Sequence, residues 1–205
     1  MKVNWMAGLA AAVFFCAAQP ALAAVNVVDA NVSYEETANV NNQELKLNGA
    51  GVRYKAIFKV YALGLYLSEN KKSSEKEVVA TRGPKRFALI LLRDMSNNEL
   101  GNGFLKTVRD NLDNEERAKI SSPMFKLGEI FSHVPELAKG SSLTIDLDPV
   151  VGLIASYNGK ILGEAIPDQG LCNAVMKIWL GEHPVDSALK RALLGQKADE
   201  RRGVN

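Results

Sequence analysis

Apolar residues alternate with polar ones, or run without interruption, over several segments of strand length. Asn158-Gly159, the strongest short-range signal for a β-hairpin, separates the last two of them. Asp148-Pro149 marks another turn, so this half of the sheet is expected to be antiparallel. The predicted strands are residues 44–49, 49–68, 86–93, 142–148, 152–158 and 160–166.

Between and after these strands, apolar residues recur at helical spacing, with capping residues ahead of them. The polar stretch 68–77 is expected to be a solvated loop that leads into a short helix. Strands, then helices, then a hairpin and further helices predict an α+β domain, in which helices gather on one face of a large antiparallel sheet. The four main predicted helices are one capped by Ser96 with Glu99 three residues on, one after Pro123, one from Asp168 to Gly181, and one at 186–194.

The first 23 residues have the pattern of a cleaved signal peptide. Lys2 precedes an apolar run at 6–18, and Pro20 and the small-x-small sequence Ala21-Leu22-Ala23 follow. The run is shorter than the roughly 20 residues that span a bilayer. We therefore expect cleavage after Ala23, export to the periplasm or beyond, and no stable membrane insertion of the mature chain.

The remaining residues, 24–205, are enough for a single domain, and no repeat or linker divides them. Removal of Lys2 changes the formal charge from +2 to +1, which offers no broad field for nucleic acid. Only Cys172 remains, so no internal disulfide is expected, and its apolar helical context predicts a small buried side chain.

Patterns typical of catalytic, metal and cofactor sites are absent from the sequence. His133 and His183 stand 50 residues apart, with no cysteine or acidic pair at metal-ligand spacing. Asp146 and Asp148 share one face of a strand, which suits either a cation or, more simply, a solvated face. We expect no metal, no cofactor and no catalytic residue.

Arg53 and Tyr61 are the unusual pair of the segment 49–68, which is rich in β-branched and aromatic residues. Taken alone, the presence of Arg53 is explained by a strand face that is exposed to solvent. If its side chain were buried, its N–H donors would need a carboxylate to accept their hydrogen bonds. In one unbroken strand, eight residues of about 3.3 Å each separate the two side chains by roughly 26 Å. They meet only if the chain folds back, yet no Gly, Pro, Asn or Asp lies between them to indicate a turn.

The segments "GAGVR", "KVYALGLYL", "RFALILLRDMS", "GKILGEAI" and "WLGEHPVDSALKRALL" together resemble the chalcone isomerase-like family, in its exported bacterial branch, over residues 45–195. The resemblance implies an open-faced β-sandwich, in which a large antiparallel sheet is layered with helices. This agrees with the fold class expected from the pattern.

The catalytic members of that family use an arginine, threonines and a tyrosine to close a ring in a chalcone. Arg53 matches the arginine, but Tyr61 stands in place of one threonine and Ile178, beside Trp179, in place of another. No tyrosine occurs from 92 to 110, where the catalytic phenol is expected. We therefore expect this chain not to be an enzyme.

The fatty-acid-binding members of the family pair an arginine with a tyrosine on the carboxylate, and Arg53 and Tyr61 match that pair. The resemblance implies that the chain folds back between them. Our leading hypothesis is a non-catalytic exported protein that binds a fatty acid or another amphipathic carboxylate in a cleft between sheet and helices. The expected cleft lining is Leu65, Phe104, Leu105, Val175, Ile178 and Trp179.

Two alternatives remain open from the sequence. One is an isomerase or intramolecular lyase that acts on another enone, with Arg53 as the electrophile. The other is an envelope interaction protein whose pocket is filled by side chains, with Arg53 paired to an internal acid such as Asp94 or Glu164.

Overall fold

The structure, a computed structural model, describes residues 24–27, 30–69, 71–132, 134 and 136–196. The expected signal peptide, residues 1–23, and His133 lie outside the described residues. No described helix is long and apolar enough to cross a membrane.

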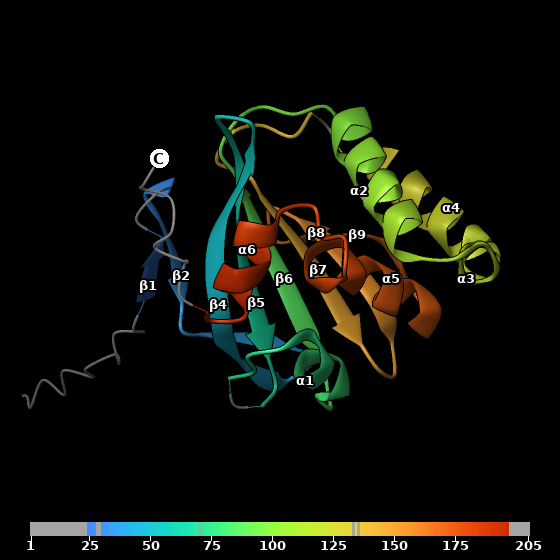
Figure 1. Cartoon of the computed structure of the whole chain (residues 1–205), viewed down its shortest axis with the longest axis horizontal. Helices are drawn as coiled ribbons and strands as arrows, with labels where there is room; N and C mark the ends of the chain where they lie inside the picture. Colours follow the sequence, from blue (N-terminus) through green and yellow to red (C-terminus); the bar gives the residue numbers. More distant parts are fainter. Residues whose placement is uncertain (1–23, 28–29, 70, 133, 135, 197–205) are drawn as a thin grey trace, which may run out of the picture.

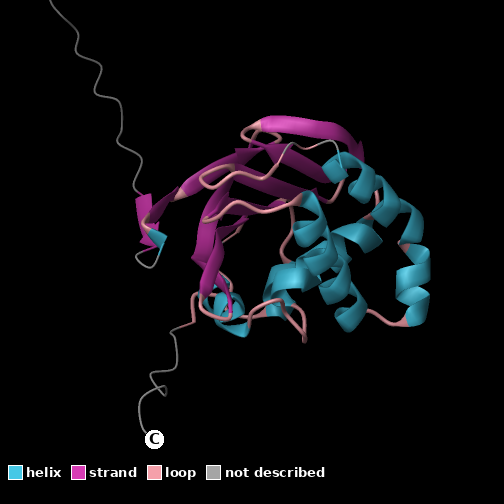
Figure 2. Ribbon diagram, turned by 90° about the horizontal axis from the view of Figure 1, so that it is seen from above, coloured by secondary structure: helices cyan, strands magenta, loops and turns pink. Residues whose placement is uncertain are grey.

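Within the described residues, seven antiparallel strands form one sheet in the order of the chain, so each strand pairs with the next. The sheet curls strongly, and the helices lie inside the curl (Figures 1 and 2). A separate pair, β1 and β2, lies at the outer side of the sheet (Figure 1). The strands are β1 Ala24–Val27, β2 Val32–Glu35, β3 Thr37–Val40, β4 Gln43–Lys55, β5 Phe58–Leu67, β6 Lys85–Leu91, β7 Ser142–Asp148, β8 Gly152–Tyr157 and β9 Lys160–Ile166.

The capping residues predicted from the sequence, Ser96 and Asp168, accept backbone N–H bonds at the start of α2 and α5. Asp186, predicted as the first residue of the last helix, instead caps α6 in the same way. The second predicted helix starts earlier than expected, because Pro123 lies within its first turn, where proline is tolerated. α3 is not among the helices predicted from the sequence. The helices are α1 Glu75–Ala80, α2 Asn97–Asn111, α3 Asn114–Lys119, α4 Ser121–Ser132, α5 Gln169–Leu180 and α6 Ser187–Leu193.

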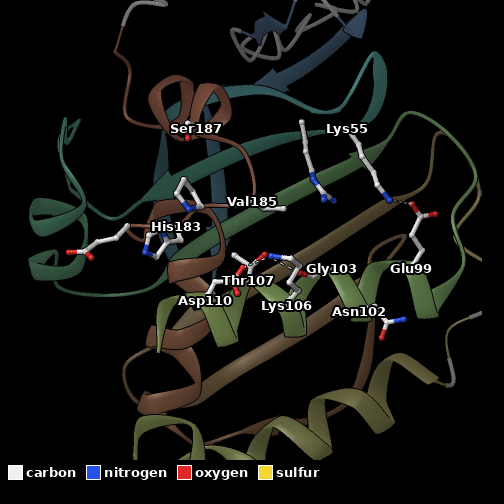
Figure 3. A pocket seen from close by; sticks show the side chains of 13 residues that line it. Lys55, Glu99, Asn102, Gly103, Lys106, Thr107, Asp110, His183, Val185 and Ser187 are labelled. Atoms are coloured by element: carbon white, nitrogen blue, oxygen red, sulfur yellow. Dashed lines mark hydrogen bonds and ion pairs between the residues drawn. The ribbon is translucent and has the colours of Figure 1, made fainter. Parts of the chain in front are cut away.

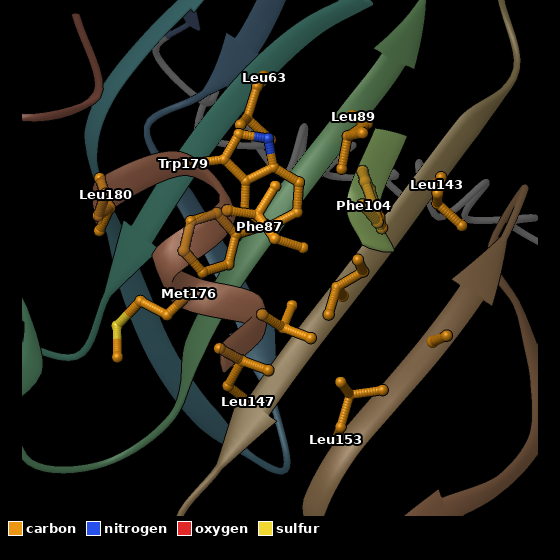
Figure 4. Close-up of a cluster of buried hydrophobic side chains, with 14 of the residues drawn as sticks. Leu63, Phe87, Leu89, Phe104, Leu143, Leu147, Leu153, Met176, Trp179 and Leu180 are labelled. Carbon is orange, nitrogen blue, oxygen red and sulfur yellow. The ribbon is translucent and has the colours of Figure 1, made fainter. Parts of the chain in front are cut away.

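The main core fills the space between the inner face of the sheet and the helices. Trp179 of α5 lies at its centre, stacked on Phe87 with ring centroids 4.6 Å apart, and Phe104 of α2 meets it edge-on at 5.4 Å. Leucines of the central strands close around these rings (Figure 4). Cys172 of α5 is buried, as predicted, and burial raises the pKa of its thiol to about 11.

A second, smaller core lies on the outer face of the sheet under β1 and β2. Tyr34 packs there and donates its hydroxyl proton to the carbonyl of Ala88. Tyr66 of β5 donates in the same way to Glu35. As a result β5 is buried on both faces from Val60 to Leu67, which explains its nearly continuous apolar sequence.

The simplest interpretation of Asp146 and Asp148, a solvated face, is wrong. Both are buried, and each is satisfied by a partner that is distant in sequence. Asp146 forms a bidentate ion pair with Arg86 at 2.6 and 2.7 Å. Asp148 accepts bonds from Asn41 and from the backbone of the turn that follows it. Neither carboxylate is left for a cation.

Candidate binding site

The chain folds back between Arg53 and Tyr61. β4 ends at Lys55 and β5 begins at Phe58, so a two-residue turn, Ala56-Ile57, replaces the single strand assumed for the 26 Å separation. Ala56 has a φ of 55°, in the left-handed region that such turns require. Arg53 and Tyr61 are direct partners across the two strands. Side chains at such positions have Cβ atoms about 4.5 to 5.5 Å apart.

Two irregularities of the hairpin direct Arg53 toward the helices. Asn48 has no partner in the register of β4, and Val60 has none in β5. The bulge at Asn48 changes which face the following residues occupy, so Gly49 and Gly51 face the helices, as Arg53 does. A Cβ on Gly49 would lie 2.2 Å from the carbonyl oxygen of Ala192, so the missing side chain allows α6 to pack directly on β4. The two glycines that precede Arg53 in the sequence therefore allow α6 to pack closely on β4.

The Arg53 guanidinium has no carboxylate partner among the described residues. Its Nε is buried and without a hydrogen bond. Its central carbon lies 5.4 Å from the centre of the Tyr61 ring, a cation–π arrangement. Arg53 is half-buried, and a ring face compensates its charge only in part, so an anion at this position is favoured.

The nearest acidic side chains are occupied by other groups. Glu99 of α2 forms two hydrogen bonds with Arg93 and lies 3.7 Å from Lys55, and the Arg93 bonds lower the pKa of its carboxyl. Asp186 caps α6 and accepts the backbone N–H of Tyr54 at 3.0 Å. These carboxylates influence Arg53 only from a distance.

The ion pair expected for a filled pocket is not present. Asp94 accepts the backbone N–H of Lys139 at 2.7 Å. Glu164 is exposed on β9, the far edge strand of the sheet. Neither acid forms a salt bridge with Arg53 in the described part of the chain.

Tyr61 is completely buried behind Arg53. Its hydroxyl oxygen accepts the indole N–H of Trp179 at 2.9 Å. Burial raises the pKa of the phenol, and the charge of Arg53 opposes that rise only in part. Tyr61 is therefore a neutral phenol at physiological pH, and its hydroxyl proton has no acceptor among the described residues. That proton is available to an anion bound at Arg53.

A cleft of about 710 Å³ opens beside Arg53, within the size range of small-molecule sites. Its walls are the end of β4, one side of α2, and the segment between α5 and α6 (Figure 3). Lys55 and Lys106 add positive charge and Glu99, Asp110 and Glu182 negative charge, and Lys106 is paired with Asp110 at 2.6 Å. Gly103, Val185 and Pro184 provide surface without charge. The lining residues are Arg53, Lys55, Glu99, Asn102, Gly103, Lys106, Thr107, Asp110, Glu182, His183, Pro184, Val185 and Ser187.

The structure separates the residues that the sequence grouped as one cleft lining. Leu65, Val175, Ile178 and Trp179 are at most 1% exposed and belong to the packed core. Phe104 and Leu105 border a different hollow of about 630 Å³, between α2 and α4. Of the expected residues, only Arg53 lines the cleft beside β4, with Tyr61 and Trp179 directly behind it.

Sequence reasoning missed the other residues of the cleft, including Lys55, Lys106, Thr107 and Val185. Lys106 lies on the exposed side of α2, a position ordinarily assigned to solvent, whereas Thr107 is buried beside Phe104 and Val108 and reads as part of the apolar face. The only sequence signal for these residues was the fold-back of the chain after Arg53 that the family resemblance implies. No group of three metal-ligating side chains occurs among the residues that the structure describes.

Comparison with known proteins places this geometry in a family. No curated protein sequence matches the chain. A solved structure, that of a fatty-acid-binding protein from Arabidopsis thaliana, is similar with a TM-score of 0.67 at 16% identity. The similarity covers 84% of this chain and 96% of the plant chain, and it confirms the fold. The family model described as chalcone isomerase-like matches residues 26–195, and the chain therefore belongs to the chalcone isomerase-like family.

Proposed function

We propose that this protein is a non-catalytic binding protein for a fatty acid or another amphipathic carboxylate. The observation that carries the proposal is the Arg53 guanidinium, which borders a cleft and has no carboxylate partner among the described residues. The similar Arabidopsis protein binds fatty acids, which supports the same ligand class here.

The carboxylate would lie on Arg53, whose fork of N–H donors matches its two oxygens. Tyr61 would donate its hydroxyl proton to the carboxylate from behind Arg53. The hydroxyl oxygen already accepts the indole N–H of Trp179, so its own proton is the part left to form a further hydrogen bond. Lys55, 3.7 Å from Glu99, would add positive charge beside Arg53, whereas Lys106 is already paired with Asp110 at 2.6 Å. These groups favour an anion over a neutral lipid of the same length.

The apolar part of the ligand would follow the flank of α2 past Gly103 and the methyl group of Thr107, toward Val185 and Pro184. A Cβ on Gly103 would touch no other atom within 4 Å, so the helix surface is open at this point. Since the core around Trp179 is already packed, the apolar part of the ligand would bind along the cleft and not within the core.

Isothermal titration of the purified protein with dodecanoate tests the proposal. Arg53→Met keeps much of the side-chain volume but removes the charge, and we expect affinity to fall on the order of 100-fold. Arg82→Met, in an exposed loop outside the cleft, should bind as the unchanged protein does. Dodecanol, which lacks the carboxylate, should bind weakly to every variant.

Equal affinity of the Arg53→Met and unchanged proteins for dodecanoate would contradict the proposal, as would equal affinity for dodecanol. Turnover of a chalcone or a related enone that disappears in Arg53→Met would instead establish an enzyme. Thermal unfolding of each variant separates a binding defect from a folding defect.

We also propose that residues 1–23 are a signal peptide and that the mature protein is exported to the periplasm. The support is the order of Lys2, the apolar run 6–18 and the small residues at 21–23. N-terminal sequencing of protein recovered from the periplasmic fraction should begin at Ala24. Recovery of the intact chain from the cytoplasm would contradict this proposal.

A further inference from the structure

The tip of the β4–β5 hairpin, residues 54–59, exposes large apolar side chains to solvent. Ile57 is 83% exposed, Phe58 64% and Tyr54 37%. They come from the last residues of β4, the turn and the first residue of β5, at the end of the sheet away from α1 (Figure 1). Isolated apolar residues are common on protein surfaces, but three at the tip of one hairpin indicate an interaction surface.

The requirements of the turn do not explain these residues. Two-residue hairpin turns with a positive φ favour Gly, Asn or Asp, which tolerate that conformation and interact well with water. Here Ala56 carries the positive φ and Ile57 completes the turn. Neither residue type favours the turn, and Ile57, 83% exposed, buries little of its side chain within the protein.

The tip is also positively charged. Lys55 and Lys59 flank the apolar residues, both are exposed, and residues 54–59 include no acid. The side chain of Lys55 is 67% exposed, and its nearest acid, Glu99, lies 3.7 Å away and already binds Arg93. Apolar and aromatic side chains between lysines are the composition of segments that lie in the interface of anionic membranes.

We propose that the β4–β5 tip docks on the surface of an anionic lipid bilayer. Ile57 and Phe58 enter the boundary between headgroups and acyl chains, while Lys55 and Lys59 remain among the anionic headgroups. This inference goes beyond the proposed binding function and does not depend on it. Because Arg53 and Lys55 belong to the same hairpin and line the cleft, docking brings the cleft mouth close to the bilayer, where amphipathic carboxylates reside.

The turn between β7 and β8 provides a matched control within the same chain. Val150 is 87% exposed, as apolar as Ile57, and lies at the opposite end of the sheet, because successive antiparallel strands turn at alternating ends. Asp148 and Pro149 precede it, and no lysine lies within the turn. It therefore has an exposed apolar side chain without the positive flanks.

An environment-sensitive dye reports the contact locally. The mature protein, residues 24–205, carries either Ile57→Cys or Val150→Cys, and the new thiol is labelled; buried Cys172 reacts slowly. With vesicles of phosphatidylglycerol and phosphatidylcholine, we expect a blue shift of the dye at position 57 and none at 150. Vesicles of phosphatidylcholine alone should give little shift, and high salt should reverse the shift as the Debye length falls.

Co-sedimentation with the same vesicles gives the affinity. Replacing both Ile57 and Phe58 by Ser should weaken binding on the order of tenfold, whereas Val150→Ser should leave it unchanged. Dodecanoate titration in the absence of vesicles should not distinguish the tip variant from the unchanged protein. Arg53→Met should retain the blue shift, so failure of docking and failure of ligand binding are separate results.

The proposal is overturned if position 57 shows no shift, or if the two labelled positions shift equally. It is overturned as well if the tip variant changes a dimer to a monomer in analytical ultracentrifugation while vesicle binding stays the same. In that case the tip contacts a second copy of this chain.

Discussion

The two hairpins β4–β5 and β8–β9 both connect their strands through two residues, but different forces determine their turns. Asn158 and Gly159 have φ values of 48° and 77°, and the Asn158 side chain also accepts the backbone N–H of Ser142 at 2.8 Å. That turn follows from local sequence. The sequence Ala56-Ile57 has no intrinsic preference for a turn. This turn forms because contacts with other parts of the protein hold β4 and β5 in place.

The difference shows where the β4–β5 hairpin obtains its stability. β5 is buried on both faces, and β4 is attached to α6 and to the loop before α1 through Asn48. These distant contacts hold the hairpin in register and leave its tip free to carry residues that serve something other than folding. Arg53 and the exposed tip residues lie on this hairpin.

Asn48→Ala should give the largest effect of the following changes. The buried amide donates to the carbonyls of Leu193 and Lys72 at 2.7 and 2.9 Å, and accepts the N–H of Lys72 at 2.6 Å. Its loss leaves buried backbone groups without partners, at a cost of about 3 kcal/mol of unfolding free energy. Asn158→Ala, in an exposed turn, should cost about 1 kcal/mol.

Urea unfolding of both variants measures the comparison. Equal costs at Asn48 and Asn158 would show that distant contacts are not what fixes the first hairpin.

Alkaline pH should destabilise the β4–β5 side through its tyrosines. Burial raises the pKa of Tyr61, and it raises that of Tyr66 to about 12. Each folded phenol therefore keeps its proton where the unfolded one, near 10, loses it, so stability is complete below pH 10 and falls as pH rises toward 12. The expected decrease is about 1 to 2 kcal/mol.

Urea unfolding at pH 8, 10 and 11.5 tests this expectation, and Tyr66→Phe should reduce the slope. If the unfolding free energy of the variant falls with pH as steeply as that of the unchanged protein, other groups cause the decrease. One such group is the thiol of Cys172, whose pKa is also raised.

Exchanging the turn residues should produce small changes of opposite sign. Gly159→Ala places a side chain at a φ of 77°, with no atom near its Cβ, and should cost about 1 kcal/mol from backbone strain alone. Ala56→Gly relieves the same strain but gives the unfolded chain more freedom, so a gain of about 0.5 kcal/mol is expected.

The two unfolding free energies, measured side by side, decide the point. A loss of stability in Ala56→Gly would mean that the Ala56 side chain contributes contacts that outweigh the strain of its φ.

Much of the fold followed from the sequence, because the signals were local. The caps at Ser96 and Asp168 and the turn at Asn158-Gly159 appear where side-chain chemistry predicted them. The short strands β1 to β3 were missed, since their residues form strands only by pairing with segments already in place. α3 was missed because it has no buried residue and therefore no apolar period.

The candidate site could be predicted only in part. Arg53 and Tyr61 were identified from the sequence, through resemblance to a family and the chemistry of a carboxylate. Leu65, Val175 and Ile178 were expected in a cleft lining and lie in the packed core instead. An apolar side chain has the same periodicity whether it faces a core or a cavity, so periodicity does not distinguish the two.

The sequence by itself determined the α+β class, the start of α2, the bounds of α5 and α6 to within a residue or two, one hairpin and the residue types available to bind an anion. Tertiary structure decided that Arg53 faces Tyr61, that nearby carboxylates bind other partners, and that the cleft lies along the polar flank of α2. The physical reason is distance along the chain. Caps and Asn-Gly turns act over a few residues, whereas the register of β4 on β5 and the partners of each charge depend on contacts between segments far apart in the sequence.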